Sequence, residues 1–198
     1  MSTQVGIGQG ASAGAWTASK AINIYTDGAC SGNQFSVNRG GWGAVLEYGE
    51  HVKEIYGGER NTTNNRMEIT AMIEALSALK VRGGSVNVFS DSSYVIECIR
   101  KKWYEGWMRG GWLTANKRPV ENRDLWERLI PLLSLQDYRF YLVKGHIGAG
   151  AREETKRKGY ARFIANNGTK LTYEEYLYIT AHNNRADELA RRGAEEQI

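Results

Sequence analysis

Four acidic residues stand at positions where their carboxylates could do chemistry together. Asp27 and Asp91 each follow a short run of apolar and β-branched residues that predicts a buried strand. Glu68 lies on the apolar stripe of a predicted helix, and Asp187 is expected in the first turn of another. Four carboxylates meeting at one point would repel one another strongly, and hard divalent cations such as Mg²⁺, which prefer oxygen ligands, would relieve that repulsion.

The two acids that follow strands also have a purely structural interpretation. Asp27 precedes Gly28, and Asp-Gly is a common turn dipeptide. Asp91 or Ser92 could simply cap the helix that follows. Taken one at a time, neither position decides between a turn former and a functional acid.

The two acids on helices have an equally plain alternative. Asn65 could be an N-cap, with Glu68 three residues later as the returning acid of a capping box. Asn184 and Asp187 repeat that spacing at the last predicted helix, where the helix dipole favours an acid. A functional interpretation therefore depends on the four acids meeting in space.

The predicted elements that would position these acids alternate between strands and helices. A strand, a tight turn and a helix in succession favour a parallel α/β arrangement, in which ligands gather at the carboxyl ends of strands. Strands are predicted at 22–27, 42–48, 52–56, 86–90 and 138–143, and the second and third form a hairpin around Gly49. Helices are predicted at 65–80, 92–101, 122–133 and 184–196.

Length and composition predict one globular domain. The 198 residues suffice for one core, and residues 1–20, rich in Gly, Ser and Ala, are expected to form a flexible tail before a single domain at 21–198. The net charge of +4 and the pI near 9.0 favour a polyanionic partner. The chain has no apolar run near the roughly 20 residues of a membrane span. The N-terminal residues lack the charged start and continuous apolar core of a signal peptide, and the chain has only two cysteines, so we expect a cytoplasmic protein that does not bind membranes.

The segment 103–126 combines aromatic and basic side chains. Four tryptophans fall there together with several cations, a composition that suits contact with a nucleic-acid backbone. The alternative is that some of the tryptophans only attach this element to the domain. We expect both to be partly true.

Five segments, in order along the chain, resemble the motifs of type 1 ribonuclease H. They cover about residues 21–148 and 181–194, and a chance match of all five in order is very unlikely. They are Thr26 to Asn33 with Gly40 to Ala44, Asn61 to Glu68, Ser90 to Val95, Lys144 to Gly148, and Ala186 to Ala190.

The resemblance implies a fold and an activity. The fold would be an α/β, ribonuclease H-like fold, with a five-stranded mixed sheet flanked by helices on both faces. The activity would be endonucleolytic hydrolysis of the RNA strand of RNA–DNA hybrids by a two-metal-ion mechanism. One or two Mg²⁺ ions, with Mn²⁺ as an alternative, would be held by the metal-binding catalytic residues Asp27, Glu68, Asp91 and Asp187.

The resemblance also implies the remaining site residues. His146 would support catalysis by moving protons or helping the product to leave. Asn33, Asn64 and the backbone near Cys30 would sense the 2′-hydroxyl that distinguishes RNA from DNA. The segment from Trp103 to Lys117, which includes Trp112, would be a basic protrusion that grips the DNA strand. The enzyme is expected to be a monomer.

The sequence departs from the family pattern at three places. The protrusion is often basic at four positions where this sequence is not, which predicts weaker or more salt-sensitive hybrid binding; they are Met108, Gly110, Leu113 and Glu121. The loop 34–39 replaces a short turn next to Asn33. An insertion at about 149–180, rich in cations and aromatic residues, is either a further nucleic-acid contact or a solvated flap.

Two other interpretations of function, and one of the histidine, stay open. The chain could be a hybrid-binding module with impaired catalysis, although all four acids are present. It could be a DNA-cutting nuclease of the same fold, although the segment from Asn61 to Glu68 argues against this. His182 competes with His146 for the role of mobile histidine, and His146 is preferred because its motif is intact.

Overall fold

The computed structural model describes residues 21–31, 38–80, 82–145, 147–148 and 150–197. The expected tail at 1–20 and the predicted site residues Asn33 and His146 lie outside these described residues. None of the described helices is both long and apolar enough to cross a bilayer.

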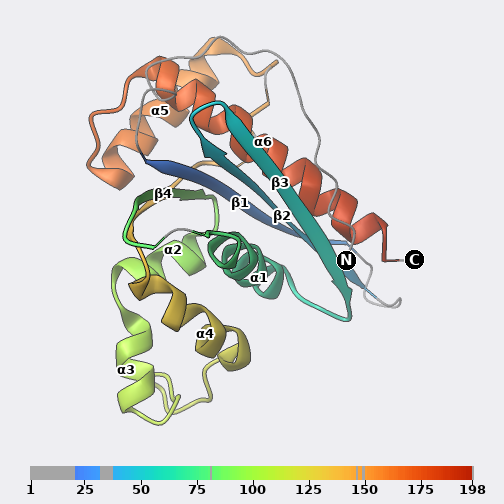
Figure 1. The fold of residues 1–198 in the computed structure, drawn as a ribbon, viewed down its shortest axis with the longest axis vertical. Coiled ribbons are helices and arrows are strands. Elements are labelled where there is room, and N and C mark those ends of the chain that lie inside the picture. Colours follow the sequence, from blue (N-terminus) through green and yellow to red (C-terminus); the bar gives the residue numbers. More distant parts are fainter. Residues whose placement is uncertain (1–20, 32–37, 81, 146, 149, 198) are drawn as a thin grey trace.

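A five-stranded mixed sheet forms the centre of the fold (Figure 1). Its strands are β1 (Ile22–Ser31), β2 (Arg39–Tyr48), β3 (His51–Arg60), β4 (Ser85–Ser90) and β5 (Asp137–Leu142), in the spatial order β3-β2-β1-β4-β5. The first three pair antiparallel, which confirms the predicted hairpin, and β4 joins β1 and β5 in parallel.

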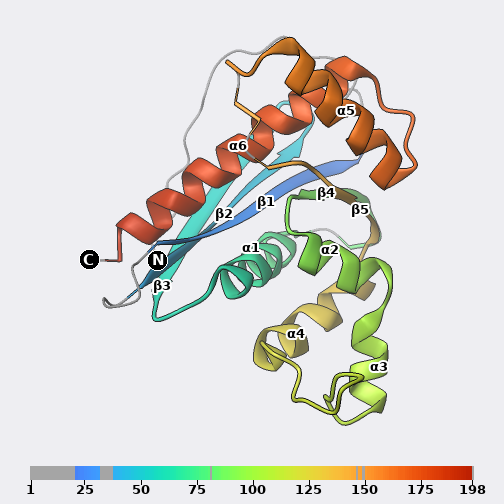
Figure 2. The same cartoon turned by 180° about the vertical axis from the view of Figure 1, so that it is seen from behind.

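Helices cover both faces of the sheet, as expected (Figures 1 and 2). They are α1 (Asn64–Ser77), α2 (Ser93–Arg100), α3 (Trp103–Arg109), α4 (Arg123–Leu129), the 3₁₀ helix η2 (Ile130–Ser134), α5 (Glu153–Asn167) and α6 (Tyr173–Glu195). Alternation along the strands divides the core, because neighbouring strand residues face opposite sides. Ile24 packs with α1, α2 and α4, whereas the next residue, Tyr25, packs with α5 and α6.

The start of α1 corrects one structural alternative for Glu68. Thr63, not Asn65, is the N-cap, and its side chain accepts a hydrogen bond from the Arg66 backbone N–H. The third helical residue is therefore Arg66, and the capping box proposed for Glu68 does not form. Glu68 lies one turn into the helix and is buried.

The start of the last helix was predicted wrongly. The helix begins at Tyr173 instead of residue 184, because Thr172 and Glu175 form a reciprocal capping box. The buried stripe is continuous through Tyr176 and Ile179, so no break separates the insertion from the last motif. Asp187 consequently lies in the interior of α6, and the helix dipole does not explain it.

Glycines allow α6 to lie unusually close to the sheet. A Cβ atom at Gly41 would come within 1.9 Å of the Ala190 carbonyl oxygen, and one at Gly43 within 2.3 Å of the Ala186 carbonyl oxygen. A side chain at either position would push the helix away from β2. This close contact fixes α6, and hence Asp187, over the centre of the sheet.

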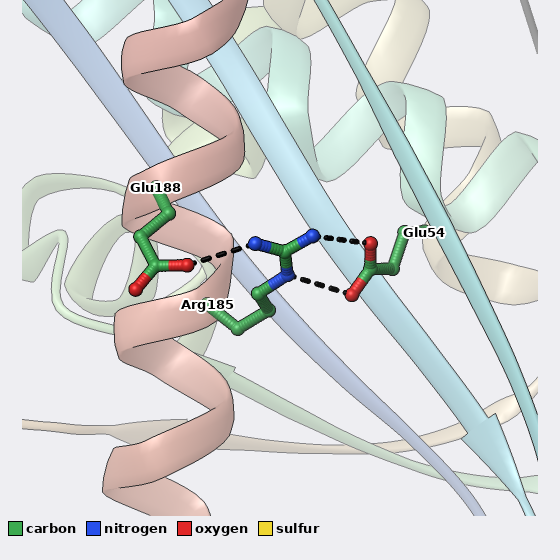
Figure 3. Close-up of polar contacts among 3 residues, drawn as sticks. All are labelled: Glu54, Arg185 and Glu188. Carbon is green, nitrogen blue, oxygen red and sulfur yellow. Dashed lines mark hydrogen bonds and ion pairs between the residues drawn. The ribbon is translucent and has the colours of Figure 1, made fainter. Parts of the chain in front are cut away.

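An ion-pair cluster holds the outer side of α6 to β3 (Figure 3). The Arg185 guanidinium donates to both carboxylate oxygens of Glu54 at 2.8 Å and to Glu188 at 2.8 Å. Hydrogen bonds from Arg185 lower the pKa of Glu54, and the same contacts raise the pKa of Arg185. Because the cluster is partly exposed, we expect it to contribute no more than about 1 kcal/mol.

Helix α5 is packed into the domain, so the interpretation of the insertion as a solvated flap is wrong. Phe163 is buried against the sheet, and Gly159 contacts the ring of Tyr176 so closely that an added Cβ would lie 2.2 Å from its hydroxyl. At the end of the helix, the Asn167 amide accepts from the Leu142 N–H (2.8 Å) and donates to the Leu142 carbonyl (2.9 Å). Arg100 also donates to the Asn167 side-chain oxygen.

This contact predicts the stability of an Asn167 variant. Asn167→Ala leaves the outward-facing polar groups of Leu142 and the donors of Arg100 without this partner, so we expect a loss of about 2 kcal/mol in the free energy of unfolding. Urea unfolding followed by circular dichroism measures it. Asn166→Ala, on the exposed neighbour that offers only its backbone carbonyl, is the matched control. Equal stability of the two variants would contradict a stabilising role for the Asn167 side chain.

Candidate active site

Three carboxylates meet where β1 and β4 run side by side. Thr26 on β1 pairs with Ser90 on β4 in the parallel register. Asp27 and Asp91, the residues that follow this pair, are therefore neighbours across the two strands. Glu68 reaches the same point from α1. One oxygen of each of these three side chains lies within 4.8 Å of the others. The parallel register therefore brings together two acids that are 64 positions apart in the sequence.

A glycine permits Glu68 to approach β1. A Cβ at Gly28 would lie 2.4 Å from the backbone nitrogen of Glu68, so any larger residue would push α1 away from the strand. The Asp-Gly pair is thus part of an extended strand, and the turn predicted as its alternative is wrong. Gly28 is required for the close packing of α1 on β1.

Asp187 joins the cluster from α6. Its charge helps to raise the pKa of both Asp27 and Glu68, so Asp187 lies close enough to act on the cluster of the other three acids. Arg191, one turn further along the helix, forms an ion pair with Asp187 at 2.6 Å. Asp187 therefore approaches from the face of the sheet opposite to Glu68, and the Arg191 guanidinium lies beside its carboxylate.

Burial and mutual repulsion make the acids hard to ionise. Burial, followed by the charges of Asp91 and Asp187, raises the pKa of Asp27 from 3.8 to about 8. Burial and the charges of Asp27 and Asp91 raise the pKa of Glu68 well above its usual range. Asp27 is 4% exposed and Glu68 6% exposed.

The unused oxygens in the cluster fit a cation. Asp27 Oδ2 and Glu68 Oε2 are buried and have no hydrogen-bond partner among the residues that the structure describes. Buried carboxylate oxygens are ordinarily paired, so two such atoms within one acid cluster indicate missing positive charge. Hard divalent cations take this kind of oxygen ligand, and the four acids suit them as ligands.

The loop after β5 contacts the acid cluster directly. A Cβ at Gly145 would lie 2.0 Å from Asp91 Oδ2, so any side chain there would have to displace that carboxylate. The next residue, His146, lies outside the described residues, and its role stays a prediction. The structure gives the competing His182 a packing position. Its ring lies 4.2 Å from that of Tyr178 and 4.9 Å from that of Tyr25, centroid to centroid.

Two of the residues predicted to sense the 2′-hydroxyl, Cys30 and Asn64, lie where β1 ends and α1 begins. The Cys30 thiol lies 3.7 Å from the Thr62 carbonyl oxygen, two residues before the exposed Asn64. Sequence reasoning missed Asn38, whose side chain donates to the Thr62 carbonyl (2.8 Å) and accepts from its N–H (2.9 Å). No periodic pattern surrounds Asn38, so the sequence offered no signal for this pair of hydrogen bonds to Thr62.

The predicted protrusion consists of α3 and the loop that follows it. Trp103 and Lys117 are exposed, as a substrate contact requires. Trp112 is partly buried against the core, with the Arg123 guanidinium over its ring at 5.2 Å. Trp126 is fully buried. The tryptophans thus divide between surface and packing positions, as expected.

The mixed sheet and the acid cluster at its centre define a protein with the ribonuclease H-like fold. The RNase H family model matches residues 19–195, and this chain belongs to the RNase H family. A Ribonuclease H of Syntrophomonas wolfei is 57% identical over 129 residues, which cover 65% of this chain and 86% of that protein. A Ribonuclease H of Chlorobaculum parvum is 42% identical over 178 residues, which cover 90% and 98%.

Solved structures share the fold. LC9-RNase H1, a type 1 RNase H with the type 2 active-site motif, matches with a TM-score of 0.64 and 25% identity, over 90% of this chain and 74% of that chain. LC11-RNase H1 in complex with an RNA/DNA hybrid matches with a TM-score of 0.50 and 18% identity, over 88% and 97%.

The raised pKa of Asp27 predicts how stability depends on pH without metal. Because its folded-state pKa of about 8 exceeds the ordinary 3.8, the free energy of unfolding falls as pH rises between these values. Asp27→Asn removes the part of this dependence that Asp27 contributes, while the raised pKa of Glu68 keeps a part of its own. At the upper end of the range we expect the variant to be more stable than the wild type by roughly 1–3 kcal/mol, equivalent to one or two pKa units.

Urea unfolding in a chelator, at several pH values, measures this difference. Glu188→Gln, which neutralises an exposed acid next to Asp187, is the control and should not change the pH dependence. A wild type as stable as Asp27→Asn at alkaline pH would show that burial and neighbouring charge do not disfavour the ionised Asp27 carboxylate.

Proposed function

We propose that this chain hydrolyses the RNA strand of RNA–DNA hybrids endonucleolytically, as a metal-dependent ribonuclease H. One observation carries the proposal: one oxygen from each of three carboxylates lies within 4.8 Å of the others where β1 and β4 meet, and two of these side chains have buried oxygens without a partner in the described part of the chain. Membership of the RNase H family supports it, as does the fold shared with a protein solved in complex with an RNA/DNA hybrid.

The proposed cofactor is Mg²⁺, with Mn²⁺ as an alternative, in one or two ions per site. Asp27, Glu68, Asp91 and Asp187 would hold it. Two such ions when bound supply an activated water on one side of the phosphodiester and stabilise the departing 3′ oxygen on the other. Cleavage of the P–O3′ bond would leave a 5′-phosphate and a 3′-hydroxyl.

The chain's own residues have three further proposed roles. Gly145 leaves room for Asp91 and so keeps its carboxylate turned into the cluster. His146, next to it, would move protons or assist product release. Asn33, Asn64 and the backbone at Cys30 would select the RNA strand through its 2′-hydroxyl.

We propose that the protrusion contacts the DNA strand through Trp103, Trp112 and Lys117. The exposed position of Trp103 and Lys117 supports this role, and the partly buried Trp112 would also hold the loop in place. We further propose that the protein acts as a monomer in the cytoplasm, where its two cysteines, both free in the structure, would stay reduced.

A cleavage assay tests the proposal. End-labelled RNA–DNA hybrid should yield RNA fragments with Mg²⁺ or Mn²⁺ and none with chelator, while single-stranded RNA and duplex DNA stay intact. Asp187→Asn should lower kcat by at least about 100-fold, because it removes a charge that holds the cation. Its neighbour on α6 provides the matched acid-to-amide control, and Glu188→Gln should stay within about twofold of wild type.

The same assay separates the alternatives. Hybrid binding without metal-dependent fragments would favour a binding module with impaired catalysis. Cleavage of duplex DNA at a rate similar to the hybrid would favour a DNA-cutting nuclease. Neither alternative is favoured by a specific observation: the acid cluster of Asp27, Glu68 and Asp91 argues against impaired catalysis, and the segment from Asn61 to Glu68 argues against a DNA-cutting nuclease.

A further inference from the structure

The net charge of the chain is concentrated in one short segment. Residues 144–162 carry six basic side chains and two acidic ones, which equals the +4 of the whole chain. The other residues carry 20 Lys and Arg against 20 Asp and Glu, and so balance. The segment consists of the loop after β5 and the first ten residues of α5.

Three of these cations are available to a partner. Lys144, Arg152 and Arg162 are exposed and form no ion pair within the described residues. Arg157 and Lys158, in contrast, pair with Glu153 and Glu154 along the helix. We call Lys144, Arg152 and Arg162 the α5 cationic surface.

This surface is held rigidly in the domain. Phe163 anchors α5 in the core, and Asn167 fixes its end to β5 through the two polar groups of Leu142. A binding surface on such a helix is already ordered before a ligand arrives, so little conformational entropy is lost on binding.

A chain of contacts connects the surface to the acid cluster. Lys144 precedes Gly145, which touches the Asp91 carboxylate. Ile147 packs so closely on α5 that a Cβ at Gly159 would lie 2.6 Å from its Cδ1 atom. The Ile147 carbonyl accepts a hydrogen bond of 2.8 Å from Asn184, which stands one turn before Asp187.

The spacing of the cations suits an extended polyanion. Arg152 and Arg162 are ten residues apart, about 15 Å along a helix, which is too far for one small anion. A nucleic-acid duplex presents a charge about every 1.7 Å of its axis and can meet both. Helix α5 and the α3 protrusion lie at opposite ends of the molecule, with the sheet between them (Figures 1 and 2).

We propose that the α5 cationic surface binds the phosphate backbone of the hybrid on the side of the acid cluster away from α3. The inference rests on the proposed function, because it gives the same substrate a second contact. Phosphate contacts of this kind position the duplex without reading its sequence. The insertion would thus supply the basic contact that the sequence suggests is weakened in the protrusion.

Steady-state kinetics on the labelled hybrid at several salt concentrations test the surface. In a triple variant with Lys144, Arg152 and Arg162 each replaced by Gln, KM should rise at least about tenfold at low salt, while kcat stays within about twofold. The slope of log KM against log salt should fall by about 2 to 3, close to one for each lost phosphate contact.

The matched control removes the same charge elsewhere. Lys53, Lys80 and Arg82 are exposed on β3 and near the amino end of β4, away from Asp91, and are likewise replaced by Gln. This control should change KM by less than about twofold. Thermal unfolding of both variants checks that the fold is intact.

The outcomes are distinct. A lower salt slope in the α5 variant alone supports the contact. Equal changes in both variants would show a long-range effect of net charge, and no change in either would show that the hybrid does not touch α5. Both of these results would overturn the proposed contact between the α5 cationic surface and the hybrid, but they would leave the proposed function unaffected. A wild type that cannot cleave the hybrid would overturn the proposed function itself.

Discussion

Repulsion between buried carboxylates is the constraint on which the structure depends. Asp27 and Glu68 are almost fully enclosed beside Asp91, and burial together with neighbouring charge opposes their ionisation. Such a cluster opposes folding at neutral pH unless positive charge enters it, because each ionised carboxylate disfavours the others. Arg191 pairs with Asp187, and its charge offsets only a small part of the rise in the pKa of Asp27. The free energy of the rest of the domain must therefore hold these groups together, and a bound divalent cation would turn a destabilising cluster into a stabilising one.

Close backbone packing supplies the required rigidity. Gly28 lets α1 reach β1, and Gly41 and Gly43 let α6 lie directly on β2. Side chains at these positions would push the helices outward, and the acids carried on the two helices would move apart. The geometry of the site thus depends on the absence of side chains at the contacts between helices and sheet as much as on the acids themselves.

The sequence predicted the strand-borne half of the site better than the helical half. Asp27 and Asp91 could be placed because each follows a buried strand, and the parallel register then makes them neighbours. Apolar periodicity placed Glu68 on a buried stripe. The N-cap predicted for its helix, Asn65, was wrong, because α1 begins at Asn64 and Thr63 is its N-cap. Asp187 was placed in a first turn because the insertion hid the true start of α6. The packing of α5 could not be predicted, because it depends on contacts with strands that are distant in the sequence.

The insertion also solves a problem at the edge of the sheet. Strand β5 is an edge strand, and its outward-facing polar groups would otherwise be open to another chain. Asn167 satisfies both polar groups of Leu142, and Arg100 donates to the Phe140 carbonyl at 2.6 Å, so side chains do here what a sixth strand would do. The carboxyl end of α5 is consequently fixed to the end of β5. An insertion that packs in this way can carry charge close to the acid cluster without loosening the loop that contacts Asp91.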